Sequence, residues 1–436
     1  MKLVILESGA KARTIKKYLG KGWIVDACNG HVQDLPSGRK NKDSSKAMWS
    51  SKPGELPKPP WSWTERAERI MSKITSKAKK SGVDEVFIAT DPDREGEFIA
   101  WRLSEILSNF DSVKRVSFNE ITKEAVLSSI ANPQELDMDL VEAAIVRRLM
   151  DRLVGFRCSK FCRSWKLKSM GRVQTPTLGY IVEKEIEREA HIPKEYNSVG
   201  VYSNGVELKV RFHESDDSEA WIDNDGKHFP DRTSDTELAK LAFDQINSNR
   251  SVKLDSIKEG TVSRKPKAPF TTDTMLQTSS STLGWSIAKT SKIASTLYQS
   301  GHITYIRTDS TRTNSTARNQ IRKHIEDNYG KEFIGDGVGD KAKGKGSVQD
   351  AHEAIRPTDP LVEVAGDDKD EKSLYRLIWS RFAASQMSNS VRERRSLTFT
   401  CAGLSVPLTG TSSWRTHAGW EEVFAWSNND IQTSPP

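Results

Sequence analysis

The sequence has few cysteines and no long apolar run, and these absences exclude several classes of protein. No stretch approaches the ~20 apolar residues that a membrane-spanning helix needs. The apolar run at residues 1–6 is followed at once by Glu7, so it is too short for a signal peptide and predicts a buried strand in a cytoplasmic protein. Of the four cysteines only Cys158 and Cys162 are close, and a single pair at helical spacing indicates small buried thiols, not a zinc ribbon.

The chain also lacks a strong excess of charge and a complete nucleotide-binding loop. Lysine and arginine outnumber aspartate and glutamate by 66 to 59, and this net charge of +7 fits a polyanionic partner without requiring one. Residues 339–346 nearly match an ATP-binding phosphate loop. Gly346 stands where a serine or threonine must hold the metal, and no buried strand precedes the stretch, so no nucleotide cofactor is expected.

The length of 436 residues predicts two to four domains. The first part is typical of an α/β domain, with strands predicted at 3–6 and 85–90 and helices at 10–19 and 95–107. Strands followed by helices indicate a parallel sheet. A polar, proline-rich insertion at 36–60 is expected to be an ordered surface loop.

The rest of the chain alternates between helical and strand patterns. Residues 139–189 are helical in pattern, with apolar residues that recur every four positions and stop at Gly155. Strands are predicted from 195 to 262, with a hairpin turn at 203–205, and alternation returns at 396–408. The region 266–390 between them is helical apart from a segment around Tyr305. The β part therefore resumes after a helical insertion.

These patterns predict a multidomain fold that combines α/β, α and β parts. The predicted divisions are an α/β domain, a helical domain, a β-rich domain in two pieces and an inserted helical domain: residues 1–137; 138–193; 194–264 with 393–430; and 265–392.

Three acids follow the second predicted strand directly. Asp91, Asp93 and Glu95 lie where the carboxyl edge of a parallel sheet binds ligands, and Glu7 ends the first strand at the same edge. Clustered carboxylates without histidine or cysteine suit Mg²⁺. The alternative is a solvated acidic loop that caps the helix beginning near Glu95.

A tyrosine lies among short apolar residues in the segment 303–310. The phenol of Tyr305 is a weak nucleophile at its ordinary pKa of ~10, so it needs partners that stabilise phosphoryl charge. Arg307 offers a planar fork for two phosphate oxygens, and residues two apart in an extended segment point to the same side. The alternative is a half-buried ring beside a solvated charge.

Seven motifs taken together resemble the type IA DNA topoisomerases, and the earliest resemble the Toprim domain of that family. They occur in the family's order, and the first two favour the topoisomerase I branch over topoisomerase III. The matching segments are residues 7–14, 30–36, 91–97, 147–155, 171–176, 305–310 and 351–357.

The resemblance implies ATP-independent cleavage of one DNA strand by Tyr305, a 5′-phosphotyrosine intermediate, strand passage and religation, which relaxes negatively supercoiled DNA. Arg307 would stabilise the phosphoryl charge, while Lys11 and Glu7 would serve the leaving 3′ oxygen. Mg²⁺ would be held by Asp91, Asp93 and Glu95, with Glu7 as a further ligand.

The same resemblance implies a set of DNA-binding residues and a partner. The partner is single-stranded DNA in negatively supercoiled duplex, bound by a monomer in the cytoplasm and associated with the nucleoid. The DNA-binding residues would be His31, Arg148, Arg152, Arg172, Gln174, His352 and Arg356. Alternatives stay open: both histidines fit a structural role, and Arg147 with Asp151 fits a helix-surface ion pair.

Two departures from the family pattern affect these expectations. Gly9 replaces the usual proline, which loosens the turn before Lys11. After Gly419-Trp420 the chain ends in the polar stretch 427–436, whereas the family continues with the second half of its single-strand groove. We therefore expect a fragment or an incomplete groove. The competing hypotheses are a non-catalytic or cleavage-only single-strand-binding fragment and a Toprim nuclease.

Overall fold

The computed structural model describes residues 1–36, 60–214, 217–339 and 353–424. Its contacts divide the chain into two compact units, each built from three segments. Unit 1 comprises Met1–Glu183, Ala268–Ile321 and Gly339–Phe382, and unit 2 comprises Lys184–Lys267, Arg322–Val338 and Ala383–Pro436. The insertion predicted as an ordered surface loop and most of the lysine-rich stretch after Gly339 lie outside the described residues. The four-domain division stays a prediction.

Unit 1 contains the predicted parallel sheet, with strand order β2-β1-β5-β6. Its strands are β1 (Lys2–Leu6), β2 (Trp23–Ala27), β5 (Glu85–Ala89) and β6 (Ser112–Arg115). The apolar runs of β1 and β5 are buried on both faces, as parallel strands covered by helices require. The two strands predicted here from hydrophobic runs are therefore confirmed.

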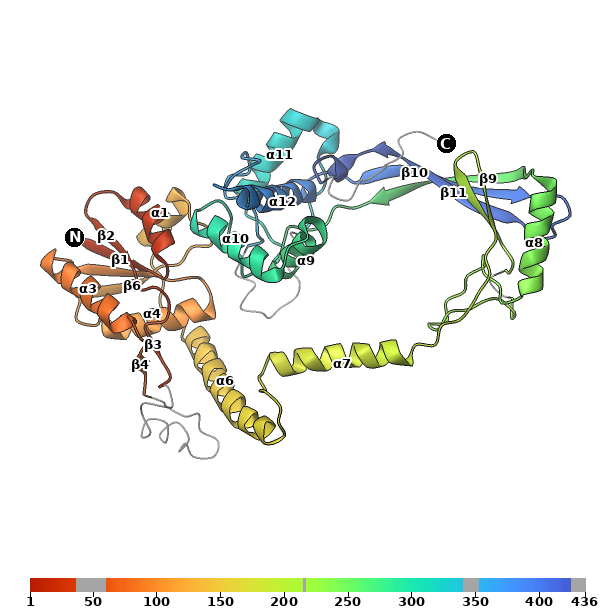
Figure 1. Ribbon diagram of the computed structural model, residues 1–436. Helices are drawn as coiled ribbons and strands as arrows, with labels where there is room; N and C mark the ends of the chain where they lie inside the picture. The colour runs from red at the N-terminus through yellow and green to blue at the C-terminus, as the bar shows by residue number, and fades with distance from the viewer. Residues whose placement is uncertain (37–59, 215–216, 340–352, 425–436) are drawn as a thin grey trace. The chain divides into compact units, whose positions relative to one another are not determined.

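Helices cover both faces of this sheet, as Figure 1 shows for the red and orange part of the chain. The elements concerned are α1 (Gly9–Leu19), α3 (Ala67–Lys80), α4 (Arg94–Ile106) and α5 (Lys123–Ala131). Leu3 and Ile5 of β1 share one hydrophobic cluster with α3 and α4, while α1 contacts α5. The alternation of side chains along β1 directs its remaining apolar residues to the opposite face, which α1 and α5 cover.

The sheet register decides which polar residues meet at the carboxyl edge. Leu6, the last residue of β1, pairs with Ala89, the last residue of β5. Glu7 and Asp91 follow these two neighbouring strands directly, so the fold brings them to one edge, as the strand order of a parallel sheet predicts.

A buried ion pair supports this edge from below. Arg115, at the end of β6, lies 2.8 Å from Glu97, and both side chains are less than 10% exposed. The same guanidinium donates to the carbonyl oxygens of Thr90 at 2.9 Å and Asp91 at 3.0 Å. Arg115 thus fastens the loop that carries the acids to the sheet beneath it.

The long helices of unit 1 follow the sheet. They are α6 (Met138–Ser164), α9 (Thr272–Leu283), α10 (Ile287–Gln299) and α12 (Lys369–Ser385), of which the last three residues of α12 belong to unit 2. The prediction that the first of them stops at Gly155 is wrong, because α6 continues through that glycine to Ser164. A single glycine costs a helix only about 1 kcal/mol, which tertiary packing offsets.

Helix α7 (Gln174–Ala190) spans the boundary between the units and has no buried residue. Its apolar side chains are strongly exposed: Leu178 at 60%, Ile181 at 61% and Ile186 at 59%. None of the helices in the described ranges combines the length and apolarity needed to cross a membrane.

Unit 2 is built on an antiparallel sheet of order β7-β8-β11-β10-β9. The strands are β7 (Gly200–Ser203), β8 (Val206–Val210), β9 (Lys253–Arg264), β10 (Ser390–Thr400) and β11 (Leu408–His417). Asn204 and Gly205 both have positive φ, at 48° and 80°, which is the two-residue turn predicted between β7 and β8. Strands from separate segments pair here, so the β part does resume after the insertion.

One helix in this unit contradicts the prediction of strands from 195 to 262. Helix α8 (Thr236–Asn249) begins after Asp235, whose carboxylate accepts from the backbone N–H groups of Glu237 and Leu238. Its residues Ala239 and Ala242 pack into the same hydrophobic cluster as β8. The apolar residues of this stretch therefore repeat at helical spacing, which a strand reading overlooks. Helix α11 (Ser315–Tyr329) crosses from one unit's residues to the other's.

We predict that Glu97→Gln destabilises unit 1 by about 3–5 kcal/mol, because it leaves the buried Arg115 guanidinium without a counter-charge. Urea unfolding monitored by circular dichroism measures the loss. Glu187→Gln is the matched control, since Glu187 pairs with Lys184 at 2.6 Å on a fully solvated surface and contributes about 0.5 kcal/mol or less. Equal effects of the two substitutions would contradict the structural role given to Arg115.

Candidate active site

One carboxylate oxygen of Asp93 accepts hydrogen bonds from both Tyr305, the predicted nucleophile, and Arg307, the predicted phosphate ligand. The Tyr305 hydroxyl donates to Oδ2 of Asp93 at 2.5 Å, and Nη1 of Arg307 donates to the same oxygen at 2.9 Å. Asp93 also caps helix α4 by accepting from the Gly96 N–H at 2.8 Å. The predicted tyrosine and the predicted acids therefore form one site, although 212 residues separate Tyr305 from Asp93.

Backbone hydrogen bonds fix the tyrosine segment to two other segments of unit 1, around Asn119 and around Arg356. The Tyr305 N–H donates to the carbonyl oxygen of Asn119 at 2.7 Å, and the Thr304 N–H donates to that of Arg356 at 2.9 Å. The ring of Tyr298 lies edge-on to that of Tyr305, with centroids 5.3 Å apart. Tyr305 is only 3% exposed, so its ring is held by packing while its hydroxyl reaches the acidic edge.

Arg356, which we expected near DNA phosphates, is buried with its guanidinium fully engaged by protein. It donates to Glu353 at 2.7 Å, to Glu120 at 2.9 Å and to the carbonyl oxygen of Pro357 at 2.9 Å. These contacts give Arg356 a part in fastening the tyrosine segment. A direct contact of Arg356 with DNA stays a prediction.

Lys11 and Glu7 lie beside Asp91 and Asp93. The ammonium of Lys11, a buried residue of α1, pairs with Asp91 and lies 4.8 Å from the centroid of the Tyr298 ring. Ser8 caps α1 by accepting from the Lys11 N–H, so the turn at Gly9 leads directly into a helix that holds the lysine. Burial raises the pKa of Glu7, and the negative charges of Asp91 and Asp93 raise it further against the effect of Lys11.

The electrostatics of the site follow from its burial and its crowded acids. Burial and the charges of Asp93 and Asp91 raise the pKa of Tyr305 well above its ordinary value, so the phenol is neutral and donates its proton. Burial opposes ionisation of Asp93, but the hydrogen bonds from Tyr305 and Gly96 and the charge of Arg307 prevail and lower its pKa. Burial acts against the charge of Arg307, but the neighbouring acids raise the pKa of the guanidinium overall.

Glu95 belongs to a second cluster beside the first. Its carboxylate lies 3.2 Å from the His31 ring, 3.4 Å from Arg148 and 3.7 Å from Arg147. Arg148 also pairs with Asp34 at 3.0 Å. The hydrogen bond from His31 is the main cause of a lowered pKa of Glu95, and Arg148 adds to it. The histidine and arginine predicted to bind DNA therefore meet at the third acid.

The remaining predicted residues lie in the middle of α6 and at the start of α7, and they contact other groups of the protein. Arg152 donates to the carbonyl oxygen of Pro36 at 2.9 Å, Arg172 lies 2.6 Å from Asp151, and Gln174 donates to Ser169 at 3.0 Å. His352 lies outside the described residues. The roles proposed for these residues in DNA binding stay predictions.

The acids were also predicted to hold Mg²⁺, and their chemistry fits that ion. Glu7, Asp91 and Asp93 supply only carboxylate oxygens. Burial raises the pKa of Glu7, and repulsion from Asp91 and Asp93 raises it further. Glu95 is directed instead to His31 and the arginines. In the described part of the chain no three acidic, histidine or cysteine side chains are arranged as a metal cage. Lys11 pairs with Asp91, and Tyr305 and Arg307 donate to Asp93. The metal ligands stay a prediction.

Several residues of the site were not found from the sequence. Tyr298 packs between Lys11 and Tyr305, Asn119 accepts from the Tyr305 backbone, and Glu120 holds Arg356. Tyr298 is the second-to-last residue of α10 and lies seven residues before Tyr305, a spacing that carries no signal of contact. Asn119 and Glu120 act through long-range contacts that no local pattern encodes.

The fold, a Toprim-like parallel sheet whose acidic edge meets a buried tyrosine, defines a class of DNA-processing protein. Residues 2–121 match the Toprim domain, and residues 135–436 match the DNA topoisomerase family. The chain is 37% identical to DNA topoisomerase 1 of Haemophilus influenzae over 94% of this chain and 49% of that protein. It is 36% identical to DNA topoisomerase 1 of Escherichia coli over 91% of this chain and 47% of that protein.

Among solved structures, full-length topoisomerase I from Thermotoga maritima matches with a TM-score of 0.78 at 30% identity, over 100% of this chain and 69% of that chain. The chain belongs to the type IA DNA topoisomerase family. It spans about half the length of the curated relatives it matches.

The lowered pKa of Asp93 predicts a pH-dependent contribution to stability. A carboxyl group whose pKa is lower in the folded than in the unfolded chain stabilises the fold above its unfolded pKa of ~3.9, and this stability is lost as the pH falls through the folded pKa. Tyr305→Phe removes one hydrogen bond to the charged carboxylate, so it should cost about 1.5–3 kcal/mol at neutral pH and progressively less toward pH ~2.

Urea unfolding at a series of pH values measures this difference. Tyr375→Phe is the control, because its hydroxyl donates to the backbone carbonyl of Val362 at 2.8 Å and its loss should cost a pH-independent amount over the acid range. A constant difference between the Tyr305→Phe variant and the unmodified chain across that range would mean that the phenol does not stabilise the Asp93 charge.

Proposed function

We propose that this chain carries the cleavage and religation chemistry of a DNA topoisomerase that breaks one strand without ATP. The observation that carries this proposal is the placement of the Tyr305 hydroxyl and the Arg307 guanidinium on one oxygen of Asp93, beside Glu7, Lys11 and Asp91. A Toprim nuclease needs the acids but has no use for a tyrosine and an arginine fastened to them.

In the proposed reaction the Tyr305 oxygen attacks a backbone phosphorus, and the bond from phosphorus to the 3′ oxygen breaks. The tyrosine becomes joined to the 5′ side, and the 3′ hydroxyl later reverses the attack, which exchanges one phosphodiester for another and conserves its energy. Asp93 orients the phenol by accepting its hydrogen bond, the phenol proton passes to water as the bond to phosphorus forms, and Arg307 stabilises the phosphoryl charge. Glu7, with its raised pKa, is suited to protonate the leaving 3′ oxygen, and Lys11 supports it electrostatically.

We assign Mg²⁺ to the oxygens of Glu7, Asp91 and Asp93, with Glu95 further away beside His31. When bound, the ion would hold the strand ends in place for religation. Lys11 and Arg307 balance the acids in the absence of the ion, since each pairs with one of them.

The DNA path that we propose runs along α6. A hollow of about 550 Å³ is lined by Arg94, Arg147 and Arg172 and by the apolar residues Ala143, Val146 and Met150. Guanidinium groups suit phosphates and apolar side chains suit bases, so this lining supports binding of single-stranded DNA. We further propose that the protein acts as a monomer in the cytoplasm on single-stranded regions of negatively supercoiled duplex.

A second candidate function is a fragment that binds or cleaves single strands without relaxing DNA. The exposed apolar side chains of α7, Leu178, Ile181 and Ile186, favour it, because an unpaired apolar face beside the strand path would weaken the grip on DNA. Relaxation of supercoiled plasmid distinguishes the two functions, since only the complete cycle changes the linking number.

We predict that Tyr305→Phe abolishes a covalent adduct with DNA. Incubated with end-labelled single-stranded DNA and denatured, the unmodified chain should remain attached to the 5′ end of the downstream fragment. The variant keeps the ring but lacks the attacking oxygen, so the adduct should fall by about a thousand-fold or more. Tyr202→Phe, at a tyrosine that is 76% exposed, is the control and should leave the yield unchanged. An undiminished adduct in Tyr305→Phe would sink the assignment.

We also predict that Asp91→Asn combined with Asp93→Asn impairs religation more than cleavage. An asparagine at position 93 still accepts the hydrogen bond from Tyr305 through its amide oxygen, but the pair has lost the charges that attract Mg²⁺. Cleaved DNA should accumulate on the protein, and the Mg²⁺ concentration needed for resealing should rise by about ten-fold or more.

The control for this pair is Asp84→Asn, at a solvated aspartate that directly precedes β5, at the opposite end of the strand from the acids. It should reseal DNA as the unmodified chain does. Normal Mg²⁺ dependence in the double variant would place the metal site elsewhere.

A further inference from the structure

Helix α3 divides its surface between the core and a lysine-rich outer face. Its residues Met71, Ile74 and Ala78 are buried in the cluster that includes β1 and α4. The other side carries an open hollow lined only by lysine and serine: Ser72, Lys73, Ser76, Lys77, Lys80 and Ser81. A surface with only these two residue types offers cations and hydroxyl donors, which are the groups that contact nucleic-acid phosphates.

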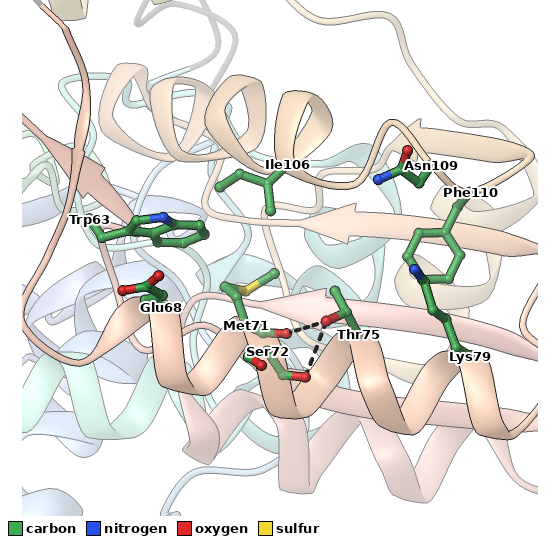
Figure 2. A pocket seen from close by; sticks show the side chains of 9 residues that line it. All are labelled: Trp63, Glu68, Met71, Ser72, Thr75, Lys79, Ile106, Asn109 and Phe110. Atoms are coloured by element: carbon green, nitrogen blue, oxygen red, sulfur yellow. Dashed lines mark hydrogen bonds between the residues drawn. The ribbon is translucent and has the colours of Figure 1, made fainter.

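A second hollow adjoins the first and shares Ser72 with it. Figure 2 shows Trp63 and Phe110 at its two ends, with Met71 and Thr75 of α3 between them and Lys79 beside Phe110. Its volume is about 250 Å³, and Trp63 and Phe110 are each partly buried against the core. Two aromatic rings anchored by packing and open on one side can stack unpaired bases.

Helix α3 carries many more positive than negative side chains. Its four lysines and Arg69 stand against one acid, Glu68. Lys77 lies 3.5 Å from Asp26, whereas Lys73, Lys79 and Lys80 form no ion pair with any residue that the structure describes. Lys73 and Lys80 therefore line the lysine and serine hollow without a counter-charge among the described residues, while the adjoining aromatic hollow is lined by one acid, Glu68, and one base, Lys79.

The surface begins beside the candidate active site and leads away from it. Trp63 belongs to β4 (Ser62–Trp63), which pairs with β3 (Gln33–Asp34), and Asp34 holds Arg148 in the Glu95 cluster. Lys80 ends α3 just before β5, at the edge of the sheet opposite to Asp91. The five residues of β5 separate the two edges by about 16 Å at ~3.3 Å per residue. A nucleotide at Tyr305 cannot also contact Lys80.

We propose that the outer face of α3, with Trp63 and Phe110, binds single-stranded DNA that continues from the candidate active site. This inference rests on the proposed function, and it assigns a second length of strand to a separate surface. Bases stack on Trp63 and Phe110, while Lys73, Lys77 and Lys80 neutralise phosphates. Asn109 and Ser72 offer hydrogen-bond donors, and the Glu68 carboxylate accepts from base amino groups.

The test compares two triple variants that remove equal charge from opposite faces of the sheet. One replaces Lys73, Lys77 and Lys80 by glutamine, and the control does the same to Lys16, Lys17 and Lys21, which are also exposed. Fluorescence anisotropy measures affinity for a labelled single strand of about thirty nucleotides and one of about eight, since single-strand sites span roughly 4–16 nucleotides. A series of salt concentrations gives the slope of affinity against salt.

The α3 variant should bind the long strand about ten-fold more weakly, with a salt slope shallower by about 2, because each lost phosphate contact removes ~0.7. Its affinity for the short strand should be unchanged, and the control should match the unmodified chain on both. Phe110→Leu keeps an apolar side chain in the core but removes the stacking ring, so it should weaken long-strand binding about five-fold or more at every salt concentration.

Three results would overturn the proposal: equal behaviour of the two triple variants, an equal loss for short and long strands, or an equal loss for a duplex of the same length. Each would show that no separate single-strand surface exists on α3. Adduct formation by the unmodified chain on the short strand tests the proposed function independently. If the unmodified chain forms no adduct but its binding to the long strand still depends on the α3 lysines, the proposed chemistry is rejected and the proposed binding surface is retained.

Discussion

The site depends on one carboxylate that serves two residues from a distant part of the chain. Asp93 accepts from both Tyr305 and Arg307, and it also caps the helix that follows it. The cap fixes the carboxylate at the edge of the sheet, and the two long-range hydrogen bonds then set where the tyrosine segment lies. The hydrogen bonds from Tyr305 and Gly96 and the charge of Arg307 lower the pKa of Asp93 against the effect of burial, whereas burial is the main cause of the raised pKa of Tyr305 and the charge of Asp93 adds to it.

Around this contact, three of the acidic side chains are each paired with a basic side chain. Asp91 pairs with Lys11, Asp93 with Arg307, and Glu95 with His31 and Arg148. Burial is the main cause of the raised pKa of Glu7, and the charges of Asp91 and Asp93 add to it. A site of this kind suits a polyanionic substrate and a cation together. A phosphate can replace the carboxylate as the partner of the guanidinium, and a metal ion can then bind the carboxylates. This exchange of partners is the physical reason for assigning the chemistry to this edge.

The support beneath the site is as specific as the site itself. Arg115 connects β6, Glu97 and the acidic loop through buried hydrogen bonds, and Arg356 does the same for the tyrosine segment through Glu120 and Glu353. Both are arginines whose rigid planar forks hold several acceptors in a fixed geometry, whereas a lysine ammonium is a rotatable point charge. One buried arginine therefore holds the acidic loop in place, and another holds the tyrosine segment. The lysines of α3, in contrast, are solvated, which is why their assigned role is binding.

Sequence patterns alone identified the parallel sheet through two of its four strands, two of the helices that cover it and the acids at its edge. These follow from local rules: apolar runs predict buried strands, and parallel strands bring their carboxyl ends together. The motifs also identified Tyr305 and Arg307, and they predicted the turn at Asn204-Gly205 from its residue types alone.

Tertiary structure decided what local rules cannot encode. The continuation of α6 past Gly155 and the helix α8 in a region predicted as strands depend on packing against other elements. The meeting of Tyr305 with Asp93, the seat of Tyr298 beside Lys11 and the burial of Arg356 depend on contacts between segments up to 287 residues apart. The sequence determined which groups are present, because chemistry resides in residue types. The fold determined which of them share an oxygen, because that requires a particular arrangement in space.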